Sequence, residues 1–191
     1  MTTRFGLIVT DALPLMTLSA ADALSCLLIP DVPVLIPDMV HAEVARDMTR
    51  LGAKEIVDWI RTHGEQVKII ATEDYAEFEA LRAINPNMRS KGRGEQAAAE
   101  VLGYEIDANP GLHIILLFED SDIRNREFVR PLPERMTASS TGDLLHELEA
   151  AGRIQSSDRI LDEANAARGR GIEAQRQPAR ANRRVPRYAS S

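Results

Sequence analysis

The chain has 191 residues, of which 44% are hydrophobic, so it is long enough to bury the core of one domain and to carry appendages. Its single cysteine excludes an internal disulfide framework, and because no apolar run resembles a signal core or a membrane span, we expect a reducing, cytoplasmic setting. The net charge of −6 is uneven, because seven arginines and one acid give residues 168–191 a charge of +6, which leaves −12 on residues 1–167.

Strand and helix patterns alternate along the first half of the chain. The apolar run at 5–10 predicts a strand, and a helix at 14–28 is expected to begin with Pro14, whose missing N–H costs little in a first turn. The next predicted elements are a strand at 32–36, a helix at 38–47, a helix at 54–62, a strand at 67–71 and a helix at 74–84 that Thr72 caps.

A loop at 85–94 is rich in Asn, Gly and Pro and separates this half from the second. Ser139-Ser140-Thr141 predicts a helix cap. The predicted elements of the second half are an Ala-rich helix at 95–104, a strand at 112–118, a short helix at 123–128, and helices at 142–151 and 158–168.

This alternation predicts an α/β fold, a three-layer domain with a central, mostly parallel sheet flanked by helices, over residues 1–168. From Gly169 onward no apolar periodicity remains, so residues 169–191 are expected to form a basic, flexible tail. An acidic body with a basic end is typical of contact with nucleic acid or an acidic partner, and a solvated, disordered end is the other interpretation.

Two of the apolar runs end in acid. The run at 5–10 stops at Asp11, and the run at 112–118 stops at Glu119-Asp120-Ser121-Asp122. Near-continuous apolar runs are typical of strands buried on both faces of a parallel sheet, where ligands bind beyond the carboxyl ends of the strands. Carboxylates at such ends favour a divalent cation, because hard cations prefer oxygen ligands.

Glu43 and Glu95 complete a group of acids that could share one site with Asp11 and Asp120. Each acid alone has an ordinary structural explanation, since acids are common at helix starts, where they complement the dipole. The joint pattern is more specific, because two of the acids end strands with no Lys or Arg on the same turn.

The chain resembles the PIN-domain family, and most closely its VapC-like toxin ribonucleases. The stretches that carry this resemblance are 8–15, 34–44, 94–99, 116–122, 140–145 and 149–154, in the family's order along residues 5–167. The chain departs from the family at Ala12-Leu13, where a small hydroxyl residue often follows the first Asp. Thr10 precedes that Asp here, and Thr17 lies further along.

The resemblance implies metal-dependent cleavage of RNA phosphodiester bonds, with Mg²⁺ or Mn²⁺ as the cofactor. It implies that Asp11, Glu43, Glu95 and Asp120 are the catalytic acids and metal ligands, and that Asp122 is an auxiliary ligand. It also implies the setting of a toxin–antitoxin pair, with RNA as substrate and an antitoxin and a second copy of the chain as partners. No membrane partner is expected.

Two other functions fit parts of the pattern. A non-catalytic PIN-fold module could hold nucleic acid or a partner through its arginines, and an α/β phospho-acceptor or hydrolase could use Asp11 with Mg²⁺. Basic residues near the proposed site have two interpretations of equal weight, contact with RNA phosphates or solvation, and they are Arg89, Lys91, Arg93, Arg124 and Arg126. The four histidines and Cys26 are expected to be structural.

Overall fold

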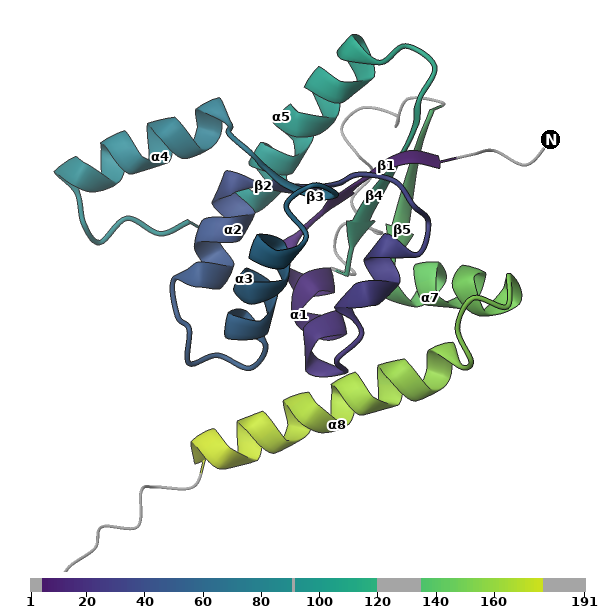
Figure 1. The fold of residues 1–191 in the computed structure, drawn as a ribbon. Coiled ribbons are helices and arrows are strands. Elements are labelled where there is room, and N and C mark those ends of the chain that lie inside the picture. Colours follow the sequence, from purple (N-terminus) through teal and green to yellow (C-terminus); the bar gives the residue numbers. More distant parts are fainter. Residues whose placement is uncertain (1–4, 91, 120–134, 177–191) are drawn as a thin grey trace, which may run out of the picture.

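A computed structural model describes residues 5–90, 92–119 and 135–176. In these residues, five strands form one all-parallel sheet in the order β3-β2-β1-β4-β5 (Figure 1). The strands are β1 (Phe5–Thr10), β2 (Val34–Pro37), β3 (Val67–Ile70), β4 (His113–Phe118) and β5 (Met136–Ser140). The α/β class expected from the sequence is therefore confirmed, and the architecture agrees with a three-layer PIN-like domain.

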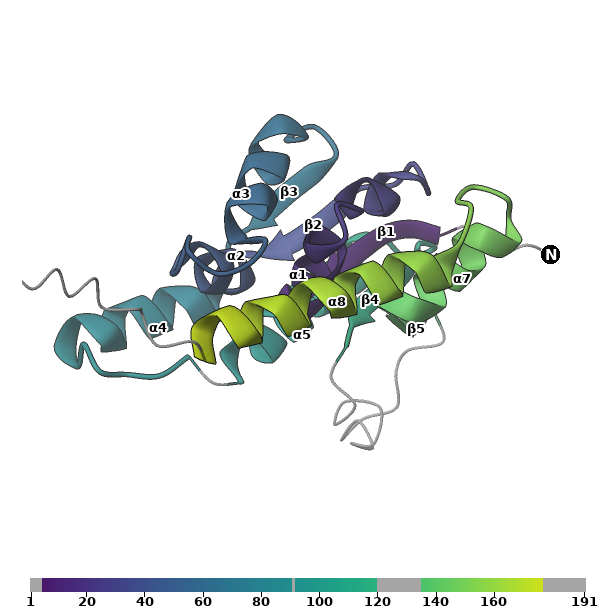
Figure 2. The same ribbon diagram turned by 90° about the horizontal axis from the view of Figure 1, so that it is seen from below.

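Helices cover both faces of the sheet. The helices are α1 (Ala12–Ala20), the 3₁₀ helix η1 (Leu24–Leu28), α2 (Asp38–Ala45), α3 (Ala53–Thr62), α4 (Glu73–Ile84), α5 (Arg93–Ala108), α7 (Thr141–Ala150) and α8 (Ser157–Arg176). Helices α1, α3 and α7 lie on one face and α5 on the other, while α8 runs across α1 and α7 (Figure 2). In the described part of the chain, no helix is long and apolar enough to cross a membrane.

The apolar runs form strands because both sheet faces are covered. In β1, Ile8 packs into the cluster beneath α1, whereas Leu7 and Val9 pack into the cluster beneath α5. In β4, Leu117 and Leu116 point to these two clusters in the same way. Because successive side chains of a strand point to opposite faces, a strand buried on both needs an unbroken apolar run.

The prediction of one continuous helix at 14–28 is wrong. Helix α1 ends at Ala20, and η1 follows after a turn. Asp22 adopts a positive φ of 53° in that turn. Aspartate tolerates this left-handed conformation better than most residues, but the conformation cannot continue an α-helix, so the chain changes direction there.

Strand β5 is absent from the sequence-based prediction. Its residues, Met-Thr-Ala-Ser-Ser, contain no apolar run, since it is the edge strand beyond β4 and only partly buried. The capping role of the following hydroxyls is confirmed, because the Ser140 side chain accepts from the Asp143 N–H at 3.1 Å and forms a capping box with that residue. Thr72 likewise caps α4 by accepting from the Tyr75 N–H at 3.2 Å.

The last helix is longer than the sequence predicts. It was expected to end at Arg168, but α8 continues to Arg176, because a glycine such as Gly169 costs only about 1 kcal/mol in a helix interior and does not stop a helix by itself. The helix expected at 123–128 and the tail residues 177–191 lie outside the described residues.

Glu149, near the end of α7, fixes the start of α8. Its carboxylate accepts hydrogen bonds from the Ser157 N–H at 2.9 Å and from the Ser157 hydroxyl. These two bonds favour the charged carboxylate and lower the pKa of Glu149 below its ordinary value of 4.5. A carboxyl group with a lowered pKa stabilises the fold above its ordinary pKa, and this stabilisation is lost as the pH falls through the folded value.

We therefore expect Glu149→Gln to lower the urea midpoint of unfolding at pH 7, because the amide is a weaker acceptor for Ser157. The difference from the wild type should begin to shrink as the pH falls below 4.5 and should be lost once the pH passes the lower pKa of the folded state, where the native carboxylate is protonated. Urea unfolding followed by circular dichroism at several pH values measures both effects. Glu147→Gln, at an exposed position of the same helix, is the control, and a deficit for Glu149→Gln that does not change with pH would contradict the prediction.

Candidate active site

The direction of chain winding changes at β1. From β1 the chain proceeds to β2 and β3 on one side, whereas β4 and β5 lie on the other side. Sheets of this kind bind ligands beyond the carboxyl ends of the two strands where the order reverses, which here are β1 and β4. Asp11 follows β1, and Glu119 follows β4. Asp11, the first of the acids predicted from the sequence, therefore lies where the topology of the sheet favours a ligand site.

Asp11 joins the two strand ends. Its backbone N–H donates to the Leu117 carbonyl of β4 at 3.1 Å. Asp11 occupies the N-cap position of α1 with an extended backbone, but its side chain makes no capping hydrogen bond. The half-buried carboxylate therefore does not serve as the cap of α1 and is directed toward the start of α5.

The carboxylates of Asp11 and Glu43 meet at Gly94. A Cβ atom placed on Gly94 would lie 3.5 Å from Asp11 Oδ1 and 3.8 Å from Glu43 Oε2. The sum of these two distances, 7.3 Å, is the upper limit for the separation of the two oxygens. Three elements thus converge, since Asp11 precedes α1, Glu43 lies in α2, and the buried Gly94 lies in the first turn of α5.

The other predicted acids are placed less directly. Glu95 follows Gly94 and so shares the start of α5, where it is exposed. Asp120 and Asp122 lie outside the described residues. Within the described ranges, no group of three His, Cys, Asp or Glu side chains is close enough to hold a metal ion. The structure therefore brings Asp11 and Glu43 together, and the rest of the ligand set stays a prediction.

Asp38 fixes the position of α2, the helix that carries Glu43. Helix α2 begins directly where β2 ends, and Asp38 accepts from the Met39 N–H at 2.8 Å. The same carboxylate accepts from the Thr72 N–H at 3.0 Å and from the Thr72 hydroxyl at 2.7 Å. Asp38 thus ties the start of α2 to the cap of α4.

Arg93 fixes the start of α5. Its guanidinium donates to Asp74 Oδ1 at 3.1 Å and lies 5.4 Å from the centre of the Phe78 ring, so it holds α4 against α5. The largely buried side chain of Arg93 contradicts the interpretation of this residue as solvated, and contact of Arg93 with RNA stays a prediction. Arg89 is exposed, and the other basic residues of that prediction, Lys91, Arg124 and Arg126, lie outside the described residues.

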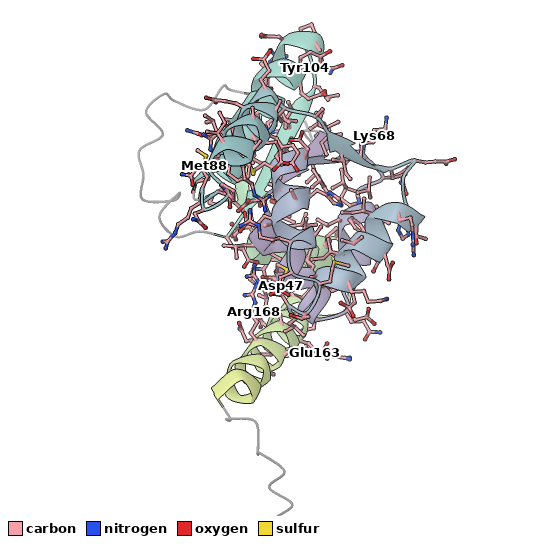
Figure 3. The ribbon with its side chains drawn as sticks, turned by 90° about the vertical axis from the view of Figure 1, so that its left-hand side faces the viewer. Asp47, Lys68, Met88, Tyr104, Glu163 and Arg168 are labelled. Atoms are coloured by element: carbon pink, nitrogen blue, oxygen red, sulfur yellow. The ribbon has the colours of Figure 1, made fainter. Side chains whose placement is uncertain are left out.

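A second polar group, which the sequence did not reveal, lies beside the end of β4. The Thr17 hydroxyl donates to Glu119 Oε2 at 2.6 Å. Arg168 Nη2 donates to the Thr17 hydroxyl and lies 3.5 Å from Glu119 Oε2, where α8 meets the body of the domain (Figure 3). Arg168 and Thr17 are 151 positions apart in sequence, so no local pattern could have paired them.

The sequence predicts structural roles for the histidines and the cysteine, and Cys26 is buried in the core. Burial lowers the pKa of His41 and raises the pKa of the Cys26 thiol, so it favours the neutral form of each group. The His113 ring is hydrogen-bonded to the Thr137 hydroxyl at 2.8 Å.

A comparison of the chain with models of known protein families found no match, and a comparison with curated protein sequences found none either. A functional proposal therefore rests on the geometry at Gly94 and on the PIN-like pattern of the sequence.

The Arg93 contacts predict a structural effect of its removal. We expect Arg93→Met to lower the free energy of unfolding by about 1–3 kcal/mol, because it leaves the largely buried Asp74 carboxylate without its cation. Urea unfolding of the purified variant measures this loss. Arg82→Met, which removes an exposed ion pair with Glu79 on α4, should cost less than about 1 kcal/mol. Equal losses in the two variants would show that the Arg93 contacts contribute no more than a surface ion pair.

Proposed function

We propose that this protein is a PIN-like, metal-dependent endoribonuclease. The observation that carries the proposal is the meeting of the Asp11 and Glu43 carboxylates at Gly94, beside the β1–β4 reversal of the sheet. The order of the acids along the chain and their secondary-structure context support the same assignment. In its proposed setting the enzyme is the cytoplasmic toxin of a toxin–antitoxin pair, with RNA as substrate and an antitoxin and a second copy of the chain as partners.

The donor chemistry at Gly94 fits a hard divalent cation, Mg²⁺ or Mn²⁺. Two carboxylates converge on a residue without a side chain, and Mg²⁺ keeps most of its waters and needs few protein carboxylates. Asp11 and Glu43 would hold the ion, with Glu95, Asp120 and Asp122 as the further ligands that the sequence predicts. When bound, such an ion would activate a water molecule and neutralise charge on the phosphoryl oxygens.

The protein itself supplies the place where the phosphate is bound and oriented. Gly92, with a φ of 79°, is the N-cap residue of α5 and, as a glycine, supplies no capping side chain. A helix start favours an anion through its first N–H groups and through the helix dipole. The same turn of α5 carries Gly94 and Glu95, so the proposed phosphate-binding end of the helix lies next to the carboxylates of Asp11 and Glu43.

Arginines are the proposed source of nonspecific RNA affinity. Six of the seven C-terminal arginines lie at or beyond residue 170, in the end of α8 and in the segment that follows the described residues. Contacts of this kind release counterions from RNA and are sensitive to salt. The same positive charge would suit an acidic antitoxin. The body of the domain is itself acidic, so neither of these negatively charged partners is expected to bind to it instead.

Removal of one acid tests the catalytic assignment. We expect Asp11→Asn to lower RNA cleavage by more than the roughly 10–100-fold that the loss of an outer-shell metal partner costs, because it removes charge from a direct ligand. Asp120→Asn should do the same. Both variants should keep the circular dichroism spectrum of the wild type, since neither substitution removes core volume. Cleavage is measured with purified protein and Mg²⁺ or Mn²⁺ on structured RNA.

The same measurements separate the proposed enzyme from the two rival functions. Wild-type protein that binds RNA but does not cleave it with either ion would favour the non-catalytic module. An acid-labile phosphoprotein would favour the phospho-acceptor.

Mg²⁺ or Mn²⁺ should raise the melting temperature of the wild type by mass action, and it should raise the melting temperature of Glu43→Gln less.

Gly94 offers a test that leaves every acid in place. Gly94→Ala should fit sterically, because the nearest atoms would lie at ordinary contact distances, and it should raise the free energy of unfolding by about 0.5–1 kcal/mol, as alanine does in a helix. The added methyl group would nevertheless occupy the space between the carboxylates, so we expect cleavage and metal-dependent stabilisation to fall by roughly 10-fold or more.

Gly103→Ala is the matched control for this test. Gly103 lies in the same helix with open space around it, so alanine there should stabilise the fold without affecting cleavage. Wild-type cleavage by a well-folded Gly94→Ala protein would place the metal away from the Asp11–Glu43 pair.

A further inference from the structure

A cavity of about 280 Å³ opens at the carboxyl ends of β4 and β5. Its polar lining comes from α1, from the end of β4, from the first turn of α7 and from α8. The residues that matter for its chemistry are Thr17, Glu119, Thr141, Gly142, Asn165 and Arg168. The cavity adjoins the proposed active site, because Glu119 directly precedes Asp120 and follows the strand whose Leu117 carbonyl accepts from the Asp11 N–H.

The hydroxyl of Thr141 is the most informative group in this lining. Thr141 is 1% exposed, and its Oγ1 atom makes no hydrogen bond to any described residue. A buried hydroxyl without a partner costs free energy, so such groups are rare unless something else satisfies them. Ser140, the preceding residue, caps α7, so the Thr141 hydroxyl is not needed for that purpose.

Backbone donors lie beside this hydroxyl. A helix start leaves the first N–H groups without intrahelical partners, and the capping box of α7 satisfies those of Ser140 and Asp143. The other two belong to Thr141 and Gly142, which both line the cavity. The α7 dipole adds partial positive charge at this point.

Arg168 supplies the positive charge on the opposite wall, with Asn165 one turn earlier in α8. Among the described residues of the lining, Glu119 is the one carboxylate, and it is engaged by the Thr17 hydroxyl at 2.6 Å and by Arg168 at 3.5 Å. Because a guanidinium has five N–H donors, the contacts of Arg168 Nη2 leave others for a ligand. Glu119 therefore positions Arg168, and the remaining groups are mostly donors, which suit an oxyanion.

We propose that this cavity binds a phosphate group of the RNA strand, adjacent to the phosphate that is cut. Only the assignment to RNA rests on the proposed function, since the donor set by itself specifies a phosphate. A strand held at a second phosphate would be oriented over the Asp11–Glu43 pair, which is how a positioning contact contributes to the rate of a reaction.

The test is binding without metal, which separates it from cleavage. The full chain is titrated, in chelator-containing buffer, into a fluorescently labelled short single-stranded RNA, and inorganic phosphate is then added as a competitor. Thr141→Val removes the hydroxyl at nearly constant volume, and Thr141→Ser retains it. Arg168→Gln removes the charge, and Thr62→Val, on the exposed side of α3, is the control.

We expect Thr141→Val and Arg168→Gln to raise the Kd for RNA by roughly 10-fold, while Thr141→Ser and Thr62→Val bind like the wild type. Inorganic phosphate should compete with RNA for the wild type and not for Thr141→Val. Wild-type affinity of Thr141→Val for both probes would overturn the proposal. Weakened binding of phosphate but not of RNA would also overturn it, since the site would then serve a free phosphate. If the wild-type protein does not cleave RNA with Mg²⁺ or Mn²⁺, the nuclease assignment is rejected, but the binding result obtained without metal is unaffected.

Discussion

The burial of β1 on both faces of the sheet, from Leu7 to Thr10, is the constraint on which the rest of this domain depends. The strand pairs with β2 on one edge and β4 on the other, and Leu7, Ile8 and Val9 are buried in clusters on the two faces. Its carboxyl end therefore emerges in the middle of one edge of the sheet, beside α2, which begins where β2 ends. Asp11 is held there by the hydrogen bond to β4, and this position allows an acid from α2 and the first turn of α5 to reach it.

Much of this arrangement could be predicted, because unbroken apolar runs and the acids that follow them are local signals. The strand at 5–10 agrees with the structure to the residue, and Asp11 and Glu43 lie together as the shared-site interpretation requires. The residue at which they meet, Gly94, could not be found by a search for chemically active side chains, because its contribution is the absence of one. Glu95, the acid that attracted attention in that turn, is exposed.

The features that the sequence did not reveal depend on contacts between distant segments. Strand β5 is stabilised by its pairing with β4 and not by an apolar run of its own, so its composition resembles that of a loop. Arg93 carries the same charge as its neighbours in the 85–94 loop, but a carboxylate and an aromatic ring from α4 determine its role. The arginine at the end of the predicted domain, Arg168, likewise acquires its role only through α1 and β4.

The path of α8 across the domain has a consequence for folding during synthesis. This helix packs Ile160 and Leu161 on the apolar cluster to which α1 contributes, and its contact with Thr17 spans 151 positions in sequence. Long-range contacts of this kind form late, because the whole intervening chain must be in place first. During synthesis, α1 leaves the ribosome long before its cover exists, so the unfinished chain exposes apolar surface. Shortened products that end before α8 would keep the acidic pair and would be prone to aggregation and proteolysis.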